Sequence, residues 1–329
     1  MAPTFIVCTG RCGSTALSNM LRLHPAILSL SEFFAFADSR FPPEPIDGER
    51  FWELLSVPNP QVRWLMDAGL RIDEVLYRPG PDRRFTIATG VPPILLTSLP
   101  HLTDDPETLF DEIGAWAVAR EPVPTVDHYR ALFAWLCGRQ GRTEWVERSG
   151  ASLPRTTRLA AAFPEARFVH LYRDGRDCAM SMSRHDAFRM MWMRGSLARA
   201  LEPEPERVAS RPAAPQAPFD REAFAAMPVP PADMGRFWSE MEIRAAPDLE
   251  RLEPGRLLDL RYEALIADPR AELARLAAFI GVEADAGWLE RASALARVRP
   301  QLWRELPSDQ RAALDDACAP AMRLLYGAG

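Results

Sequence analysis

The chain has 329 residues, of which 47% are hydrophobic, and carries a formal charge of −6 at pH 7 with a pI near 5.6. This acidic balance argues against a general nucleic-acid binder, and no run approaches the roughly 18 apolar residues of a membrane-spanning helix. Five scattered cysteines favour a reducing environment, and the scattered histidines show no metal-ligand spacing. With no signal peptide visible before Thr4, we expect a cytoplasmic protein.

The first 32 residues predict a strand, a tight loop, a helix and a second strand. Phe5–Cys8 is a short apolar run, and residues 14–23 show helical spacing. Pro25 ends this helix because proline cannot continue the backbone hydrogen bonds. A second apolar run at 26–30 closes at Ser31-Glu32.

The loop of this unit reads Gly10-Arg11-Cys12-Gly13-Ser14-Thr15. A strand, a tight loop and a helix present backbone N–H groups to a phosphate. A nucleotide kinase loop also needs Gly-Lys-Ser/Thr, but all 39 basic residues of this chain are arginine. The loop therefore predicts an anion site without the chemistry of a Walker site.

The following hundred residues predict a mainly helical region. Residues 37–60 read as a loop because prolines are frequent there. Helical patterns follow near 61–77, 106–119 and 126–139, and a strand is expected at 143–147.

The second half alternates helices and strands, with one proline-rich interruption. This alternation predicts the α/β class, with a parallel sheet covered by helices on both faces. Residues 202–231 are proline-rich and predict a mobile lid or a disordered excursion. The expected elements are helices at 153–163, 175–181, 269–280 and 308–325, and strands at 167–172 and 257–261.

A second anion signal lies where the strand 167–172 ends. Arg173 follows this strand, and Ser181 comes eight residues later, about two turns into the next helix. Both side chains can then face the crevice where open α/β sheets bind ligands. The strand ends in Arg and not in the Asp that would hold Mg²⁺. Two anion sites without a metal carboxylate suggest a nucleotide with phosphates at both ends of its ribose.

These motifs together resemble the sulfotransferases that use 3′-phosphoadenosine 5′-phosphosulfate (PAPS). The first motif of that family matches Gly10–Thr15, and its second, an Arg followed eight residues later by Ser, matches Arg173 and Ser181. A third element matches Arg261-Tyr262-Glu263 through Pro269, and His24-Pro25 through Glu32 resembles the subgroup that includes tyrosylprotein sulfotransferases and many bacterial members. The resemblance covers 1–36, 144–190 and 256–281, roughly a third of the chain.

The resemblance implies one sulfotransferase domain over 1–329, with a P-loop-like parallel sheet of about five strands. It also implies transfer of a sulfuryl group from PAPS to a hydroxyl of a small-molecule acceptor, with 3′-phosphoadenosine 5′-phosphate (PAP) as product and no metal. Glu32 is then the general base, and Arg11 and Arg148 stabilise the reacting groups. The expected donor-binding residues are Arg11, Cys12, Gly13, Ser14, Thr15 and Ala16 for the 5′-phosphate, Arg173 and Ser181 for the 3′-phosphate, and Tyr262.

The chain departs from the family pattern at three places. Cys12 stands where Ser is common, and Arg148 stands where the subgroup often has Lys. At the fourth position after the second-motif Ser, where a basic residue often binds the 3′-phosphate, this chain has His185, with Arg184 beside it.

Several alternatives stay open at this point. His101 and His128 are rival bases, because cytosolic members of the family use His. The protein is otherwise a non-catalytic PAP-binding protein or, less in keeping with its motifs, a P-loop phosphotransferase. Residues 37–143 are expected to form a helical insertion on the acceptor side. The acceptor (a lipophilic alcohol, a phenol, a sugar or a peptidyl tyrosine) and a homodimeric state are not decided by the sequence.

Overall fold

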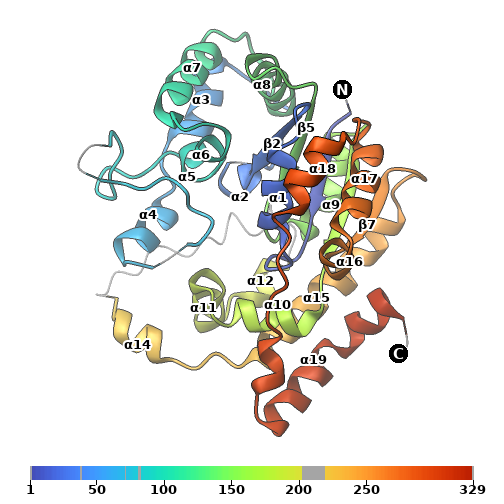
Figure 1. The fold of residues 1–329 in the computed structure, drawn as a ribbon. Helices are drawn as coiled ribbons and strands as arrows, with labels where there is room; N and C mark the ends of the chain where they lie inside the picture. The colour runs from blue at the N-terminus through green and yellow to red at the C-terminus, as the bar shows by residue number, and fades with distance from the viewer. Residues whose placement is uncertain (1, 38, 71, 81–82, 202–218, 328–329) are drawn as a thin grey trace.

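The computed structural model describes residues 2–37, 39–70, 72–80, 83–201 and 219–327. Within these ranges, a five-stranded sheet lies at the centre in the order β2-β5-β1-β6-β7 (Figure 1). Every neighbouring pair is parallel, which confirms the expected fold class. The strands are β1 (Thr4–Val7), β2 (Ile27–Ser31), β5 (Glu144–Arg148), β6 (Arg167–Tyr172) and β7 (Leu257–Arg261).

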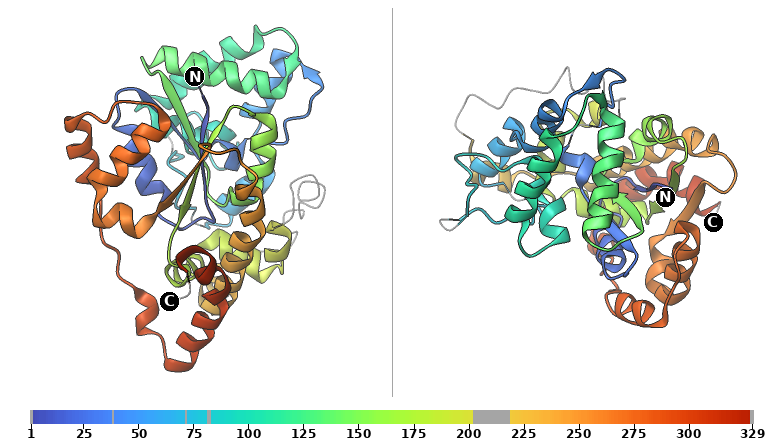
Figure 2. Two further views of the ribbon diagram at one scale, coloured as in Figure 1. Left: turned by 90° about the vertical axis from the view of Figure 1, so that its right-hand side faces the viewer. Right: turned by 90° about the horizontal axis from the view of Figure 1, so that it is seen from above.

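Each strand contributes side chains to two hydrophobic cores, because successive side chains point to opposite faces of a sheet. On β1, Ile6 packs into one cluster, whereas Phe5 and Val7 pack into the other. Figure 2 shows helices on both faces of the sheet. The first cluster takes side chains from α1 (Ser14–Arg22), α10 (Gly175–Met182), α15 (Pro231–Glu250), α17 (Pro269–Ile280), α18 (Ala286–Ser293) and α19 (Ser308–Tyr326).

The second cluster lies under the helices that connect β2 to β5, together with one helix that follows β5. These helices are α2 (Phe33–Phe36), α3 (Gly48–Ser56), α5 (Pro93–Leu96), α6 (Ser98–Leu102), α7 (Pro106–Val118), α8 (Thr125–Arg139) and α9 (Thr156–Ala162).

Two helices begin where an Asp-Pro pair predicts it. The Asp105 carboxylate accepts a hydrogen bond from the backbone N–H of Thr108 at 3.3 Å, at the start of α7. The Asp268 carboxylate accepts one from Ala271 at 3.1 Å, at the start of α17. Such caps satisfy free N–H groups of the first turn and contribute about 1 kcal/mol each.

The prediction of a loop over 37–60 is wrong in its second half. There α3 begins after Asp47, whose carboxylate accepts from the Arg50 N–H at 2.8 Å, and it buries Phe51 and Leu55. The prolines flank this helix and do not interrupt it. A short antiparallel pair also forms here, between β3 (Pro45–Ile46) and β4 (Val123–Pro124).

The helix expected over 61–77 is shorter in the structure. It is α4 (Pro60–Asp67), and Gly69 follows it with a φ of 69°, a left-handed conformation that ends helices. The chain from 72 to 80 is then irregular and reaches the functional site described below.

Part of the proline-rich segment 202–231 lies outside the described residues, namely 202–218. The described remainder forms α14 (Arg221–Ala226) and leads directly into α15. Sequence reasoning missed α15, whose Trp238 is fully buried. The other helices are α11 (Asp186–Met193), α12 (Leu197–Ala200), α16 (Tyr262–Ala267), η1 (Leu153–Arg155) and η2 (Leu302–Glu305).

None of the helices in the described ranges is both long and apolar enough to cross a membrane.

Candidate active site

The carboxyl ends of the five parallel strands meet at one edge of the sheet, which is where open α/β folds bind ligands. The chain places a site residue at every one of these ends. The loop Cys8–Gly13 follows β1, Glu32 follows β2, Arg148 ends β5, Arg173 follows β6 and Tyr262 follows β7.

A cavity of about 750 Å³ opens at this edge. The Cys12 side chain is fully buried in the hydrophobic cluster behind the loop and does not line the cavity. A donor contact from Cys12 would therefore come from its backbone and not from its side chain. The other predicted site residues all line the cavity: Arg11, Gly13, Ser14, Thr15, Ala16, Glu32, Arg148, Arg173, Ser181 and Tyr262.

The loop after β1 adopts the left-handed backbone conformation at three residues. Gly10 has a φ of 85°, Gly13 a φ of 93° and Arg11 a φ of 59°. A left-handed φ at a non-glycine residue stores strain and is often found at functional sites. A Cβ added to Gly13 would lie 2.2 Å from the Tyr262 ring. The loop and Tyr262, the first residue of α16, therefore pack against each other only because residue 13 has no side chain.

Gly13→Ala is expected to destabilise the protein by several kcal/mol, since it adds both a left-handed alanine and a clash with the Tyr262 ring. Chemical denaturation measures the effect. Gly138→Ala is the matched control: Gly138 lies on α8 with no atom within 4 Å of an added Cβ. This control should be neutral or stabilise by up to about 1 kcal/mol. Equal effects of the two substitutions would contradict the packing described here.

Glu32 and Arg148 form a buried ion pair at the neighbouring ends of β2 and β5. The backbone N–H of Glu32 donates to the carbonyl of Arg148 at 2.7 Å, which extends the strand register and sets the two side chains together. The backbone N–H of Gly150 donates to Glu32 Oε2 at 2.9 Å. Burial raises the pKa of the Glu32 carboxyl, against the opposing charge of Arg148. A raised pKa suits a general base that works near neutral pH.

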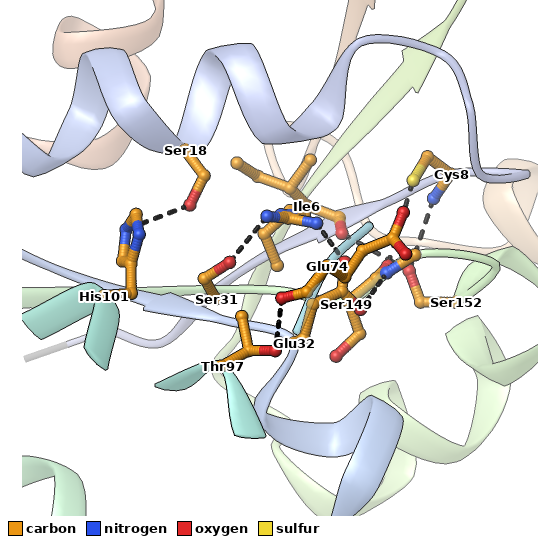
Figure 3. A network of polar contacts seen from close by, with 12 residues as sticks. Ile6, Cys8, Ser18, Ser31, Glu32, Glu74, Thr97, His101, Ser149 and Ser152 are labelled. Carbon is orange, nitrogen blue, oxygen red and sulfur yellow. Dashed lines mark hydrogen bonds and ion pairs between the residues drawn. The ribbon is translucent and has the colours of Figure 1, made fainter. Parts of the chain in front are cut away.

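Arg148 is itself held in place by its surroundings. A second guanidinium nitrogen donates to Ser31 Oγ at 2.6 Å, and Figure 3 shows Ser31 and Glu32 side by side in this network. The Arg148 side chain is only 2% exposed, and its Nε has no hydrogen-bond partner among the described residues. An unpaired donor this deeply buried is costly unless a ligand reaches it.

Glu147 precedes Arg148 but belongs to the opposite side of β5 and does not line the cavity. Its Oε1 accepts from the Phe34 N–H at 3.2 Å and from the Ser149 hydroxyl at 2.5 Å. Burial raises the pKa of Glu147 to about 7. This residue anchors the start of α2 and provides an internal comparison for Glu32.

Arg173 lies against Tyr262, with its guanidinium carbon 4.7 Å from the centre of the ring. It donates to Asp177 Oδ2 at 3.0 Å, and its buried Nε has no partner in the described part of the chain. The Nε of Arg11 donates to Ser181 Oγ at 2.9 Å. The two predicted anion motifs, about 170 residues apart in sequence, therefore touch each other.

Sequence reasoning missed two acidic residues of the site, Asp73 and Glu74. Glu74 accepts from Arg11 Nη1 at 2.8 Å and lies 3.0 Å from His185 Nε2, while Asp73 lies 3.6 Å from Arg11 Nη2. Burial alone would raise the pKa of Glu74, but His185 and Arg11 hold it at about 2. No sequence signal marks these residues, because they lie in a stretch with a helical pattern.

The rival histidines lie away from the cavity lining. His101 is buried beside Ser18 (Figure 3), 3.4 Å from its Oγ, and burial lowers the pKa of His101 to about 3. His128 stacks on Phe51 with ring centroids 4.6 Å apart, and its Nε2 lies 2.7 Å from the carbonyl of Ile46. His101 therefore has structural contacts with α1, and His128 has structural contacts within the insertion. His185 and Arg184 do line the cavity.

A model described as the sulfotransferase family matches residues 3–286. The chain belongs to the sulfotransferase family. This match confirms the resemblance read from the motifs, whereas the assignment to the subgroup with a Glu base stays a prediction. None of the curated proteins compared with this sulfotransferase matches it.

Solved structures of low sequence identity align with nearly the whole of this sulfotransferase. The sulfotransferase domain of the curacin biosynthetic pathway has 14% identity over 99% of this chain and 97% of its own, with a TM-score of 0.50. The sulfotransferase domain of the Synechococcus PCC 7002 olefin synthase has 20% identity over 98% of this chain and 93% of its own, with a TM-score of 0.47. The sulfotransferase of Alicyclobacillus acidocaldarius has 17% identity over 100% of this chain and 97% of its own, with a TM-score of 0.40. The first of these likenesses supports the fold, not the acceptor.

Within the described residues, no group of three or more His, Cys, Asp or Glu side chains is arranged to hold a metal ion.

Proposed function

We propose that this sulfotransferase moves a sulfuryl group from PAPS to a hydroxyl of a small-molecule acceptor. One observation carries the proposal: two anion-binding segments share a cavity with a buried carboxylate. Arg11 and Ser181 join those segments by their hydrogen bond of 2.9 Å, and Glu32 lines the same cavity.

The donor half of the cavity suits a nucleotide with two separate anionic groups. The backbone N–H groups at the start of α1 and its helix dipole favour the 5′-phosphate. Arg173 offers its guanidinium, and Ser181 a hydroxyl, for the 3′-phosphate. Tyr262 packs against both Gly13 and Arg173, so it holds the two halves of the donor site together.

PAPS supplies the activated sulfuryl group, and the remaining chemistry falls to side chains of the chain. Glu32, held by Arg148 and the Gly150 N–H, takes the proton of the acceptor hydroxyl. Arg148 and Arg11 supply positive charge where negative charge develops.

The two rival functions are less well supported. A P-loop phosphotransferase would need a loop lysine, which the sequence lacks, and a metal-binding Asp where β6 ends in Tyr172-Arg173. A non-catalytic PAP-binding protein would not need a buried Glu of raised pKa at the cavity, as Glu32 is. All five cysteines are free and buried, which fits the proposed cytoplasmic location.

Calorimetric titration with PAP against ADP tests the donor site, and transfer of ³⁵S from labelled PAPS to a panel of alcohols and phenols tests catalysis. We expect tight PAP binding, weak ADP binding and labelled product. PAP binding without transfer to any acceptor would favour the non-catalytic alternative. Equal affinity for ADP and PAP would contradict the assignment of Arg173 and Ser181.

A further inference from the structure

We propose that the acceptor is a lipophilic hydroxyl compound with no negative charge near its hydroxyl, and that Asp73 and Glu74 enforce this choice. The inference rests on the proposed function and adds the class of acceptor to it.

The part of the cavity outside the donor motifs has an apolar wall. Its side chains come from the end of α2, from α4, from the irregular segment after α4 and from α11. On α4, Val62 and Leu65 are three residues apart and so lie on one face of that helix. An apolar wall with few polar groups binds apolar ligands. The residues are Phe36, Val62, Leu65, Ile72, Phe188 and Met191.

The charges of the cavity leave little attraction for an anionic acceptor. Five arginines line it (Arg11, Arg148, Arg173, Arg184 and Arg299), together with four carboxylates (Glu32, Asp73, Glu74 and Asp177). The 3′-phosphate of the donor alone brings up to about two negative charges, and the phosphosulfate adds more. Once the donor is bound, the cavity is therefore negative overall, and its arginines serve the donor.

Asp73 and Glu74 stand between the donor loop and the apolar wall. Ile72, the residue before them, belongs to the wall, while Glu74 bonds to Arg11 of the loop at 2.8 Å. Glu74 lines the same cavity as Glu32, the proposed base, and its negative charge adds to the raised pKa of Glu32. Asp73, Glu74 and Glu32 thus line one cavity, so the charges of Asp73 and Glu74 act where the acceptor hydroxyl must lie.

Glu74 is fixed in this position. His185, whose side chain is only 4% exposed, holds the carboxylate from the other side at 3.0 Å. The Thr97 hydroxyl donates to the Glu74 carbonyl at 2.6 Å (Figure 3). A carboxylate held ionised in this way repels a second anion and attracts a cation nearby.

The test compares three matched acceptors at saturating PAPS: octanol, an amino-octanol and a hydroxyoctanoate, each charge one carbon from the hydroxyl-bearing carbon. We expect kcat/KM for the carboxylate to be at least tenfold below that for octanol, roughly the effect of one like-charge contact near a protein surface. The amine should match or exceed octanol.

Glu74→Gln should raise the carboxylate-to-octanol ratio of kcat/KM about three- to tenfold. Asp67→Asn is the matched control, because Asp67 is an exposed carboxylate on α4 that does not line the cavity. This control should leave the ratio unchanged.

The outcomes separate this inference from the proposed function. Failure of the wild-type protein to bind PAP would contradict the proposed function itself. With PAP bound, equal or faster transfer to the hydroxyoctanoate overturns only the acceptor inference. Transfer to none of the three acceptors also overturns the acceptor inference. An unchanged carboxylate-to-octanol ratio of kcat/KM in Glu74→Gln overturns it as well.

Discussion

Glu32→Gln is expected to lower kcat by about 10²- to 10⁴-fold, the usual contribution of a general base. PAP affinity should stay within a few-fold, because Glu32 lies at the end of β2, outside the two anion-binding segments. Steady-state kinetics with ³⁵S-labelled PAPS and calorimetry with PAP measure the two quantities.

Glu147→Gln is the control, since Glu147 is equally buried, lies one residue from Arg148 and does not line the cavity. The Glu147→Gln variant should keep kcat within a few-fold of the wild-type value, even if its free energy of unfolding falls. Wild-type turnover in Glu32→Gln, or an equal loss in both variants, would remove Glu32 from the role of base.

The acid side of the pH profile gives an independent view of Glu32. A base acts when deprotonated, so kcat/KM should rise with pH through the pKa of Glu32. Burial raises that pKa, so the rise should lie above the range of an ordinary Glu. Glu32→Gln should flatten this limb of the profile.

Arg173→Ala is expected to weaken PAP binding by about 1.5–3 kcal/mol, the scale of a charged hydrogen bond, or roughly 10- to 150-fold. Arg173 lines the cavity with its guanidinium carbon 4.7 Å from the centre of the Tyr262 ring, and its buried Nε has no partner among the described residues. Calorimetry with PAP measures the loss.

Binding of adenosine 5′-monophosphate, which lacks the 3′-phosphate, separates a phosphate contact from general damage to the site. Its affinity should change little in Arg173→Ala. An equal loss for both nucleotides would assign Arg173 to the architecture of the pocket, and unchanged PAP binding would remove it from the donor site.

The positions of the two candidate anion motifs at the edge of the sheet were predictable because their signals are local. The strand at 167–172, the helix after Gly175 and the position of Arg173 between them follow from apolar runs and breakers, and β6 has the expected bounds. The sheet was predictable for the same reason, since buried parallel strands read as short apolar runs. Cys12 shows the limit of this reasoning: its place in the loop was predicted, but not that its side chain faces the core.

The helices without a clear local signal were missed or misplaced. The prolines around α3 suggested a loop, although its buried Phe51 and Leu55 pack against the core. Packing of an amphipathic face over long range outweighed local composition there. Helix α15 was missed because it follows a proline-rich stretch.

The sequence by itself determined the α/β class, the phosphate-type loop, the second Arg–Ser motif and Glu32 as a candidate base. The first three depend on backbone conformation and residue spacing along short segments of the chain, whereas Glu32 as a base is implied by the resemblance to the sulfotransferase family. Only the tertiary structure decided that Arg11 meets Ser181, that Arg148 pairs with Glu32, and that Asp73 and Glu74 reach the cavity. The physical reason is that these contacts join segments from different elements. Their distances follow from the parallel strand order and from core packing, which no local pattern records.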